Sequence, residues 1–251
     1  MHWDIAILSE PGERENNEDC VAVTSGDAGI CTVLCDGLGG HDAGEVASKC
    51  VCDSVTAAFE KAPEGADIGE LVCELLQNAQ DELMKMQIEL DKQNGMKTTA
   101  CCLLIQDGKT AAAYVGDSRI YQFRKNKVLL RSSDHSIPQY LVNIGEIKER
   151  DIRHHPDRNK LLRVMGSEWE TPRYQRLKLE EPVCGDAFLL CTDGFWEWIE
   201  EKDMERFLKR TSCSEEWLNT MKKFIYARGR GNRMDNLSAI AIMRVEGDDG
   251  G

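Results

Sequence analysis

The sequence lacks a long apolar run. No stretch of its 251 residues approaches the roughly 18 consecutive apolar residues that a membrane-spanning helix requires. The first residues, MHWDIAILSEPGERENNED, contain no basic segment followed by a long apolar core, which is the pattern of a secretory leader. We therefore expect a cytoplasmic protein with no membrane partner.

Positive charge is also scarce. The 31 Lys and Arg residues are outnumbered by 44 Asp and Glu residues, which gives a formal net charge of -13. Nucleic-acid binding through phosphate contacts needs a basic face, so this charge balance excludes a nucleic-acid partner. We expect most of the acidic residues on solvated helix faces, and some in a carboxylate cluster that a cation neutralises.

Disulfide and zinc motifs are missing, although the chain has 11 cysteines. No CxxC pair occurs, and many of the cysteines lie within or beside apolar, strand-like runs. We expect reduced, mostly buried thiols that act as small hydrophobic side chains in a reducing compartment.

Three signatures of phosphate-handling proteins are absent. The chain contains no Gly-x4-Gly-Lys-Ser/Thr loop, which a nucleotide-binding kinase or GTPase requires. No cysteine lies in a Cys-x5-Arg loop of the tyrosine-phosphatase kind, so a thiolate mechanism has no support. Asp36-Gly37-Leu38 does not supply the Asp-x-Asp of a haloacid-dehalogenase-like phosphatase.

The hydrophobic pattern that is present predicts a single α+β domain over 1–246, with a short polar tail at 247–251. Strand-like runs cover 4–9, 20–25, 30–36, 98–106, 110–116, 119–124, 127–132, 174–180, 186–192 and 237–246. Helix-like runs cover 43–61, 67–94 and 214–228, and SIPQYLVNIGEI within the mixed segment 134–172 resembles a further amphipathic helix. Short turns inside two strand pairs indicate antiparallel hairpins, and paired helices between strand blocks indicate layers.

Acidic residues stand at the edges of these apolar strands. They are Asp36, Asp117 and Asp193 at strand ends, and Glu18, Asp19 and Asp235 just before strands. One Asp-Gly after a strand is usually a plain turn, but several strand ends on one rim can bring their acids together. Converging carboxylates repel one another unless a cation lies between them, and Mg²⁺ and Mn²⁺ prefer oxygen ligands. The pattern favours a two-metal centre that activates water and holds a phosphoryl group.

Seven short motifs then occur in order along nearly the whole chain. They are R-E-N-N-E-D at 14–19, D-G-L-G-G-H-x-A-G-E-x-A-S at 36–48, T-T-A at 98–100, G-D-S-R-I-Y at 116–121, D-H-S at 134–136, T-D-G-F-W-E at 192–197 and D-N-L-S at 235–238. In this order they resemble the metal-dependent protein serine/threonine phosphatases of the PP2C type (PPM family), in their compact bacterial form. The resemblance implies a four-layer α/β/β/α sandwich, with two antiparallel sheets flanked by helix pairs.

The resemblance also implies the site. Asp36 would bridge two Mn²⁺ or Mg²⁺ ions, and the Gly37 carbonyl oxygen would bind one of them. The other implied ligands are Asp193 and Asp235 for the first ion, Glu18 for the second with Asp19 directly or through water, and Asp117 with Asp193 for a third ion in bacterial members. Arg14 matches the arginine that grips the substrate phosphate.

The implied activity is hydrolysis of phosphoserine and phosphothreonine by a metal-activated water, without a phosphoenzyme. The implied partners are phosphorylated proteins and a bacterial Ser/Thr kinase that the phosphatase opposes, and we expect a monomer. A domain of this kind that binds partners without catalysis would have lost metal ligands. Here Asp36, Asp193 and Asp235 are all present.

Two questions stay open at this point. The segment from about 137 to 175 corresponds to the flap of the family, and its cations Arg153, Arg158, Lys160 and Arg163 either meet phosphorylated substrate or belong to a solvated loop. His41 either protonates the leaving group or serves the turn before the helix, whereas we expect a structural role for His135.

Overall fold

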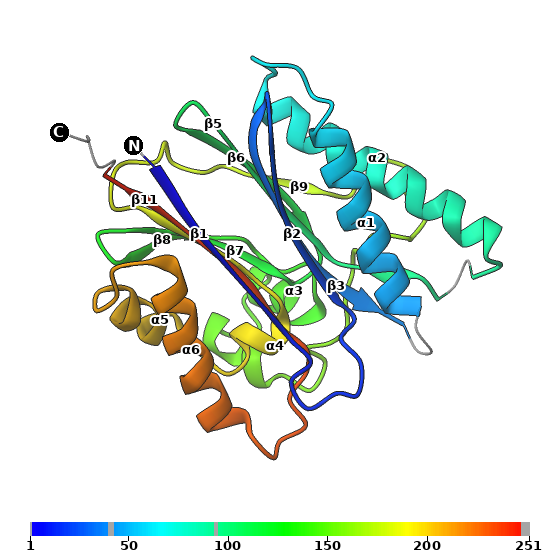
Figure 1. Cartoon of the computed structure of the whole chain (residues 1–251). Helices are drawn as coiled ribbons and strands as arrows, with labels where there is room; N and C mark the ends of the chain where they lie inside the picture. Colours follow the sequence, from blue (N-terminus) through cyan, green and yellow to red (C-terminus); the bar gives the residue numbers. More distant parts are fainter. Residues whose placement is uncertain (1, 40–42, 93–94, 247–251) are drawn as a thin grey trace.

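A computed structural model describes residues 2–39, 43–92 and 95–246. Two antiparallel β-sheets face each other, and helices cover the outer face of each (Figure 1). One sheet has the strand order β1 (His2–Glu10), β11 (Leu237–Val245), β10 (Ala187–Cys191), β7 (Arg119–Arg124) and β8 (Lys127–Arg131). The other has the order β2 (Asp19–Gly26), β3 (Gly29–Leu38), β5 (Ala100–Gln106), β6 (Lys109–Val115) and β9 (Gln175–Leu177), and β4 (Lys97–Thr98) pairs with β3.

The helices form one pair for each sheet. α1 (Ala43–Phe59) and α2 (Ile68–Glu89) cover the sheet that contains β3, and α5 (Glu201–Leu208) and α6 (Ser214–Gly229) cover the sheet that contains β10 (Figure 1). Three shorter elements, α3 (Ile137–Asn143), the 3₁₀ helix η1 (Glu149–His154) and α4 (Asp193–Trp196), lie in the connections. The predicted four-layer α/β/β/α sandwich is therefore confirmed.

Alternating side chains on the central strands build the layers. In β3, Val33 and Cys35 pack in the core beneath α1 and α2, whereas Leu34 between them packs in the core between the sheets. In β10, Leu189 faces the helices and Leu190 faces the opposite sheet. Because side chains on a strand alternate between its two faces, strands with both faces buried read as continuous apolar runs, as these two do.

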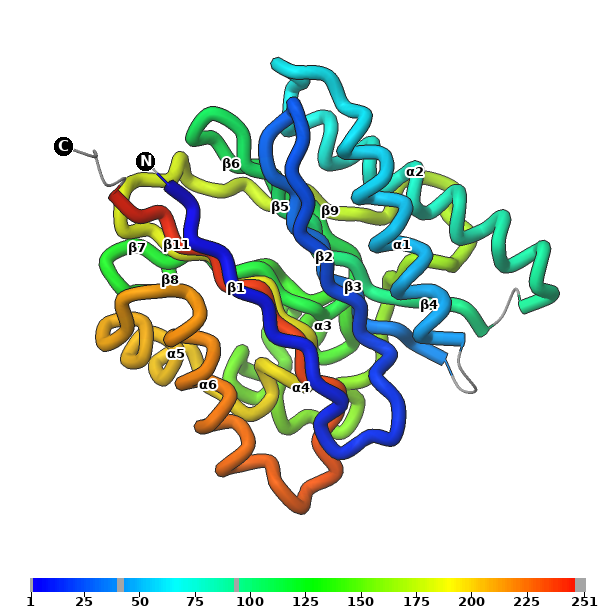
Figure 2. The backbone as a smooth tube through the Cα atoms, viewed as in Figure 1, coloured from blue at the N-terminus to red at the C-terminus, as the bar shows by residue number. Residues whose placement is uncertain are grey.

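Strands that are far apart in sequence close the first sheet. β1 pairs with β11 along its whole length, from His2 opposite Val245 to Glu10 opposite Leu237. Figure 2 shows these two strands side by side, one from each end of the chain. As a result, the loop that follows β1 and the loop that precedes β11 meet at the same end of the sandwich.

The predicted hairpins β5–β6 and β7–β8 are confirmed, but several boundaries were wrong. α5 was not expected, α3 is much shorter than the predicted amphipathic helix, and β9 has 3 residues. Asp193 does not end a strand, because β10 stops at Cys191 and Asp193 is the first residue of α4. Asp36 lies inside β3, which continues to Leu38.

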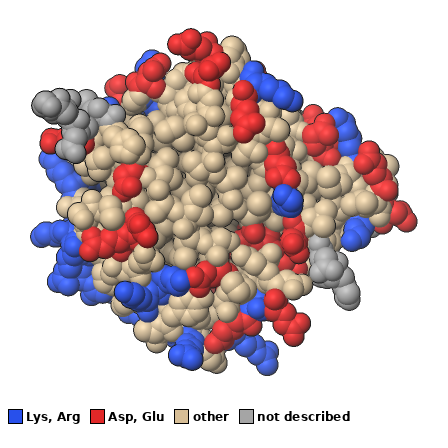
Figure 3. All heavy atoms as spheres, in the orientation of Figure 1, with Lys and Arg blue, Asp and Glu red and all other residues tan. Residues whose placement is uncertain are grey.

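Much of the negative charge lies on solvated helix surface, as expected from the composition. Exposed acids on α1 and α2 include Glu45, Asp53, Glu74, Asp81 and Glu82. On the face drawn in Figure 3, Lys and Arg side chains gather around α5 and α6. Within the described residues, no helix has the length and apolar composition needed to cross a membrane.

The core between the sheets contributes to the stability of the fold. Leu190 is fully buried there, so Leu190→Ala should lower the free energy of unfolding by about 2–5 kcal/mol in urea denaturation. Leu129, whose side chain is exposed on β8, is the matched control, and its change to alanine should stay within about 0.5 kcal/mol of wild type. Equal effects of the two substitutions would contradict the assigned core.

Candidate active site

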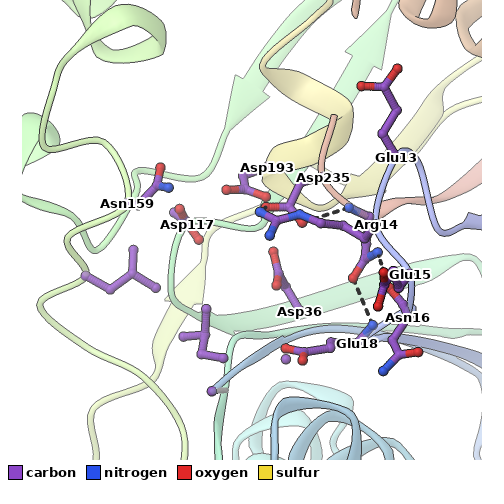
Figure 4. Close-up of a pocket in the computed structure, with 15 residues that line it drawn as sticks. Glu13, Arg14, Glu15, Asn16, Glu18, Asp36, Asp117, Asn159, Asp193 and Asp235 are labelled. Atoms are coloured by element: carbon purple, nitrogen blue, oxygen red, sulfur yellow. Dashed lines mark hydrogen bonds and ion pairs between the residues drawn. The ribbon is translucent and has the colours of Figure 1, made fainter. Parts of the chain in front are cut away.

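A cavity of about 630 Å³ opens at the end of the sandwich where the loop after β1 and the loop before β11 meet. Its described lining residues are Glu13, Arg14, Glu15, Asn16, Glu18, Asp36, Gly37, Leu38, Gly39, Asp117, Asn159, Leu161, Asp193, Asp235 and Asn236. Figure 4 shows the carboxylates of Asp36, Asp117, Asp193 and Asp235 directed into the same space, with Arg14 beside them. Four aspartates from separate parts of the sequence therefore share one cavity.

Two threonines fix the backbone of Asp36. The Asp36 N–H donates to Thr99 Oγ1 at 2.9 Å, and Thr99 N–H returns a bond to the Asp36 carbonyl oxygen at 2.9 Å. Thr98 Oγ1 donates to the same carbonyl oxygen at 2.8 Å. The backbone groups of Asp36 are thus held by Thr98 at the end of β4 and by Thr99 just before β5, so Asp36 is presented to the cavity from a rigid strand. The T-T-A motif thus acts as a brace for this acid.

Asn236 organises the loop that carries Glu18. Its Oδ1 accepts from the Glu18 N–H at 2.8 Å, and its Nδ2 donates to the carbonyl oxygens of Pro11 and Asn16 at 3.0 and 2.8 Å. The Glu18 carbonyl oxygen accepts from Ser48 Oγ at 2.6 Å and from Gly37 N–H at 3.1 Å. One amide side chain therefore ties the first cavity loop to the start of β11.

Close backbone approach explains two glycines at the site. A Cβ on Gly37 would lie 2.4 Å from the Gly44 carbonyl oxygen and 2.5 Å from that of Glu18, so β3, α1 and the Glu18 loop could not meet around a larger residue. A Cβ on Gly194 would lie 2.1 Å from the Asn236 carbonyl oxygen. Glycine at 194 lets α4 begin against the Asp235–Asn236 segment, which brings Asp193 and Asp235 together.

Among the described residues that line the cavity, Arg14 is the only Lys or Arg. Its Nη2 donates to Asp235 Oδ2 at 2.7 Å, and the two side chains are 56% and 38% exposed. The pair is open to solvent, so the remaining guanidinium N–H groups of Arg14 can reach a ligand that enters the cavity. Asp235 Oδ1 accepts from the Asn236 N–H at 2.9 Å.

Burial and mutual repulsion perturb these carboxyl groups strongly. Burial, followed by the charges of Asp19 and Asp193, raises the pKa of Asp36 well above its ordinary value. The pKa of Asp117 is raised well above its ordinary value by the same causes, burial first and then Asp193. Burial with Glu197 and Asp235 nearby raises the pKa of Asp193 to about 7. The cavity is thus a place where negative charge is unfavourable unless a cation compensates it.

Asp19 differs from the other predicted ligands in its position. It lies opposite Asp36 in the β2–β3 ladder, but it does not line the cavity. Its Oδ2 accepts from Thr192 Oγ1 at 3.1 Å, whereas its buried Oδ1 has no hydrogen-bond partner. Burial and the charges of Asp193 and Asp235 raise the pKa of this carboxyl group to about 7.

The donor set fits hard divalent cations. Carboxylate oxygens and the Gly37 backbone are present, and the orphaned oxygen of Asp19 is a buried acceptor that lacks a donor. In the described chain, no three His, Cys, Asp or Glu side chains form a closed ligand set for a single ion. Mg²⁺ and Mn²⁺ do not require one, because they keep several water ligands and use one or two carboxylates each.

The remaining sequence predictions have mixed outcomes. His41 and Gly40 lie outside the described residues. His135 has the structural role expected for it, since it is buried, its ring stacks on Tyr114 with centroids 4.9 Å apart, and its Nδ1 accepts from Gly116 N–H. The sequence did not point to the flap residues Asn159 and Leu161 as cavity residues, and no local motif marks them.

Comparison with known proteins decides the family. The sequence profile described as protein phosphatase 2C matches residues 12–225, which is most of the chain. The chain belongs to the protein phosphatase 2C family. The resemblance predicted from seven motifs is thereby confirmed.

Named relatives and solved structures agree with this assignment. The serine/threonine phosphatase stp of Listeria welshimeri is 30% identical over 92% of this chain and 91% of its own length. The serine/threonine protein phosphatase PstP of Mycobacterium tuberculosis is 28% identical over 94% of this chain, which spans 44% of the length of that relative. The crystal structure of the PstP catalytic domain in complex with two manganese ions is 25% identical, with a TM-score of 0.81 over 97% of this chain and 99% of that domain.

The raised carboxyl pKa values predict how stability depends on pH without metal. Between the ordinary value of 3.8 and about 7, the folded protein holds protons on Asp19 and Asp193 that the unfolded chain has released. The free energy of unfolding in EDTA should therefore fall as the pH rises from about 4 to about 7. Denaturant unfolding across this range measures the slope.

The variant Asp193→Asn supplies the control for this slope. His135 contributes in the opposite sense, since burial lowers its pKa, but the difference between wild type and variant cancels that contribution. The variant should lose less stability than wild type as the pH rises. Identical slopes would show that Asp193 does not carry the unfavourable charge.

Proposed function

We propose that this chain is a Mn²⁺- or Mg²⁺-dependent phosphatase that hydrolyses phosphoserine and phosphothreonine in proteins. The observation that supports the proposal best is the convergence of Asp36, Asp117, Asp193 and Asp235 in one cavity beside Arg14, in a chain of the protein phosphatase 2C family. The relatives from Mycobacterium tuberculosis and Listeria welshimeri are named as serine/threonine phosphatases.

We assign separate roles to the residues of the site, which are metal binding and phosphate binding. Asp36, Asp193 and Asp235 with Glu18 and the Gly37 carbonyl would hold two ions, and Asp19, which lies behind the cavity, would serve the second ion directly or through water. When bound, such ions supply a water of lowered pKa and positive charge for the phosphoryl oxygens. Arg14 binds the phosphate, because a guanidinium presents two parallel N–H donors to a phosphate dianion. We propose attack by this water without a phosphoenzyme, because the aspartates of the cavity would be engaged as ligands of the ions.

The proposal also includes a third ion, bound by Asp117 and Asp193. Asp117 and Asp193 line the same cavity, and the charge of Asp193 contributes to the raised pKa of Asp117. We propose that a third cation relieves this repulsion. Its ligands would be these two carboxylates and several waters, because a hard cation such as Mg²⁺ keeps part of its water shell when it has few protein ligands.

The cellular setting of the enzyme is a further part of the proposal. We propose that it acts as a monomer in the cytoplasm and opposes a bacterial Ser/Thr kinase by acting on the proteins that the kinase phosphorylates. Support comes from the bacterial relatives and from the cysteines, all 11 of which are free and 8 of which are buried. The alternative of a partner-binding domain without catalysis is disfavoured because the acids it would lose share one cavity here.

Metal-dependent hydrolysis is the direct test. Wild-type protein should hydrolyse p-nitrophenyl phosphate and a phosphothreonine peptide with Mn²⁺ and stop when EDTA is added. Asp193→Ala should lose at least about a hundredfold in kcat, since a metal ligand contributes more than the groups that merely orient one. Asp53→Ala, an exposed acid on α1, is the control and should match wild type. An inert wild type would refute the enzyme, and turnover that resists EDTA would refute the metal mechanism.

The role of Arg14 gives a separate prediction. Arg14→Lys keeps the positive charge but loses the paired donors, so the KM for the phosphopeptide should rise by about tenfold or less, and Arg14→Ala should raise it further. Steady-state kinetics at saturating Mn²⁺ measures both. An unchanged KM in Arg14→Ala would exclude phosphate binding by this residue.

A further inference from the structure

The loop between α6 and β11 carries two exposed arginines just before a predicted metal ligand. Its sequence is GRGNRMD at 229–235, and both Arg230 and Arg233 are exposed to solvent. Figure 2 shows this loop beside the loop between β1 and β2. Asp235 lines the cavity, as do residues of the neighbouring loop, whereas the two arginines do not. They therefore stand outside the cavity, close to its edge.

The carboxylate of Glu13 holds this loop in shape. Its Oε1 accepts from the Gly231 N–H at 2.7 Å and its Oε2 accepts from the Met234 N–H at 3.2 Å. The Glu13 N–H in turn donates to the Met234 carbonyl oxygen at 3.0 Å. A Cβ on Gly12 would lie 2.1 Å from the Asp235 carbonyl oxygen, so the two loops run in direct contact. Figure 4 shows the Glu13 side chain directed away from the aspartates, which means that this acid shapes the edge of the cavity.

Arg233 has a backbone conformation that arginine seldom adopts. Its φ is 57°, in the left-handed region where glycine and asparagine are the usual residues. The Asn232 N–H donates to the Gly229 carbonyl oxygen at 2.9 Å, which closes the turn just before it. A glycine would take this conformation without strain, so an arginine here points to a use for its guanidinium group.

The two guanidinium groups differ from other cations of the molecule in having no partner acid. Among the described residues, no carboxylate lies within ion-pair distance of Arg230 or Arg233. Arg228 at the end of α6, by contrast, pairs with Asp203 at 3.6 Å. Three of the four flap cations whose role the sequence left open are also paired. They are Arg153 with Glu201, Arg158 with Glu197 and Lys160 with Asp157.

The edge of the cavity therefore holds positive charge on an acidic molecule. Arg14, Arg230 and Arg233 outnumber Glu15 there, because Glu13 is bonded to the amides of the loop. The whole chain has a formal net charge of -13, so these local cations decide whether an acidic peptide can approach. Exposed guanidinium groups bind carboxylates through paired N–H donors. Each extended peptide residue spans about 3.3–3.6 Å, so residues that flank a phosphorylated one can reach beyond the cavity.

We infer that Arg230 and Arg233 form a basic rim that selects phosphoproteins with acidic side chains close to the phosphorylated residue. The inference rests on the proposed function for its reaction and adds a substrate preference to it. Arg14 binds the phosphate, whereas the basic rim binds carboxylates that flank it in the sequence of the substrate. Because the basic rim lies outside the cavity, a small aryl phosphate does not reach it. Loss of the two arginines therefore affects acidic peptides alone.

The test uses phosphothreonine peptides of equal length whose flanking residues are acidic, neutral or basic. For wild type, kcat/KM at low ionic strength should be about threefold to tenfold higher for the acidic peptide than for the neutral one, and lowest for the basic one. The preference should shrink in about 0.5 M salt, because exposed pairs are screened. Equal kcat/KM for the three peptides in wild type would overturn the inference.

Variants of the basic rim locate the preference. Arg230→Gln/Arg233→Asn should lose it while p-nitrophenyl phosphate hydrolysis stays within about twofold of wild type, and asparagine suits the left-handed backbone at 233. Arg230→Lys/Arg233→Lys should keep most of it, because the charges remain. Lys109→Glu is the matched control, since it changes the net charge by the same two units at an exposed position at the end of the sheet opposite to Asp36. It should retain the wild-type preference.

The outcomes separate the basic rim from the proposed function. A preference that survives in Arg230→Gln/Arg233→Asn, or a matching loss on p-nitrophenyl phosphate, would refute the basic rim. If wild type hydrolyses none of the substrates, the proposed function fails, and fluorescence anisotropy of the same labelled peptides then decides the rest. Tighter binding of the acidic peptide by wild type than by the variant would support the basic rim as a site for acidic peptides, and equal binding would refute it.

Discussion

The repulsion among buried carboxylates is the constraint on which the site depends. Asp36, Asp117 and Asp193 are enclosed at one end of the sandwich, where the charges of Asp117 and Asp193 raise the pKa of Asp36 and the charge of Asp193 raises the pKa of Asp117. Such an arrangement weakens the folded state near neutral pH unless cations enter, so the rest of the molecule must hold it in place. Three apolar cores, the threonine brace on Asp36 and the Asn236 tie to Glu18 provide that support.

Much of the fold could be predicted from sequence because its central strands are buried on both faces. The apolar runs of β3 and β10 carry a clear signal, and so does the long apolar face of α2. α5 was missed because its sequence, EKDMERFL, is mostly polar and its three buried positions depend on packing against the sheet and α6. Helix α4 has 4 residues, too few for a periodic pattern, so Asp193 was placed on a strand instead.

The sequence predicted the cavity aspartates, Glu18 and Arg14, but it could not predict how the fold holds them. Motifs named the acids and Arg14, yet they could not show that Asp19 sits behind the cavity, because that follows from its register opposite Asp36 and its bond to Thr192. They gave no sign of Asn159, whose place depends on the path of the flap. Trp196 links these parts, since it contacts Arg153 on the flap and bonds to the backbone of Asp117.

The central claim is that cations replace protons among these carboxylates. Its most direct test is calorimetric titration of the EDTA-treated protein with Mn²⁺ near pH 7, in two buffers of different ionisation enthalpy. The account predicts that at least two ions bind per chain with release of protons, because Asp19 and Asp193 have pKa values raised to about 7. It also predicts that Asp36→Asn loses the tight binding. Absence of Mn²⁺ binding, or binding by Asp36→Asn equal to that of wild type, would contradict it.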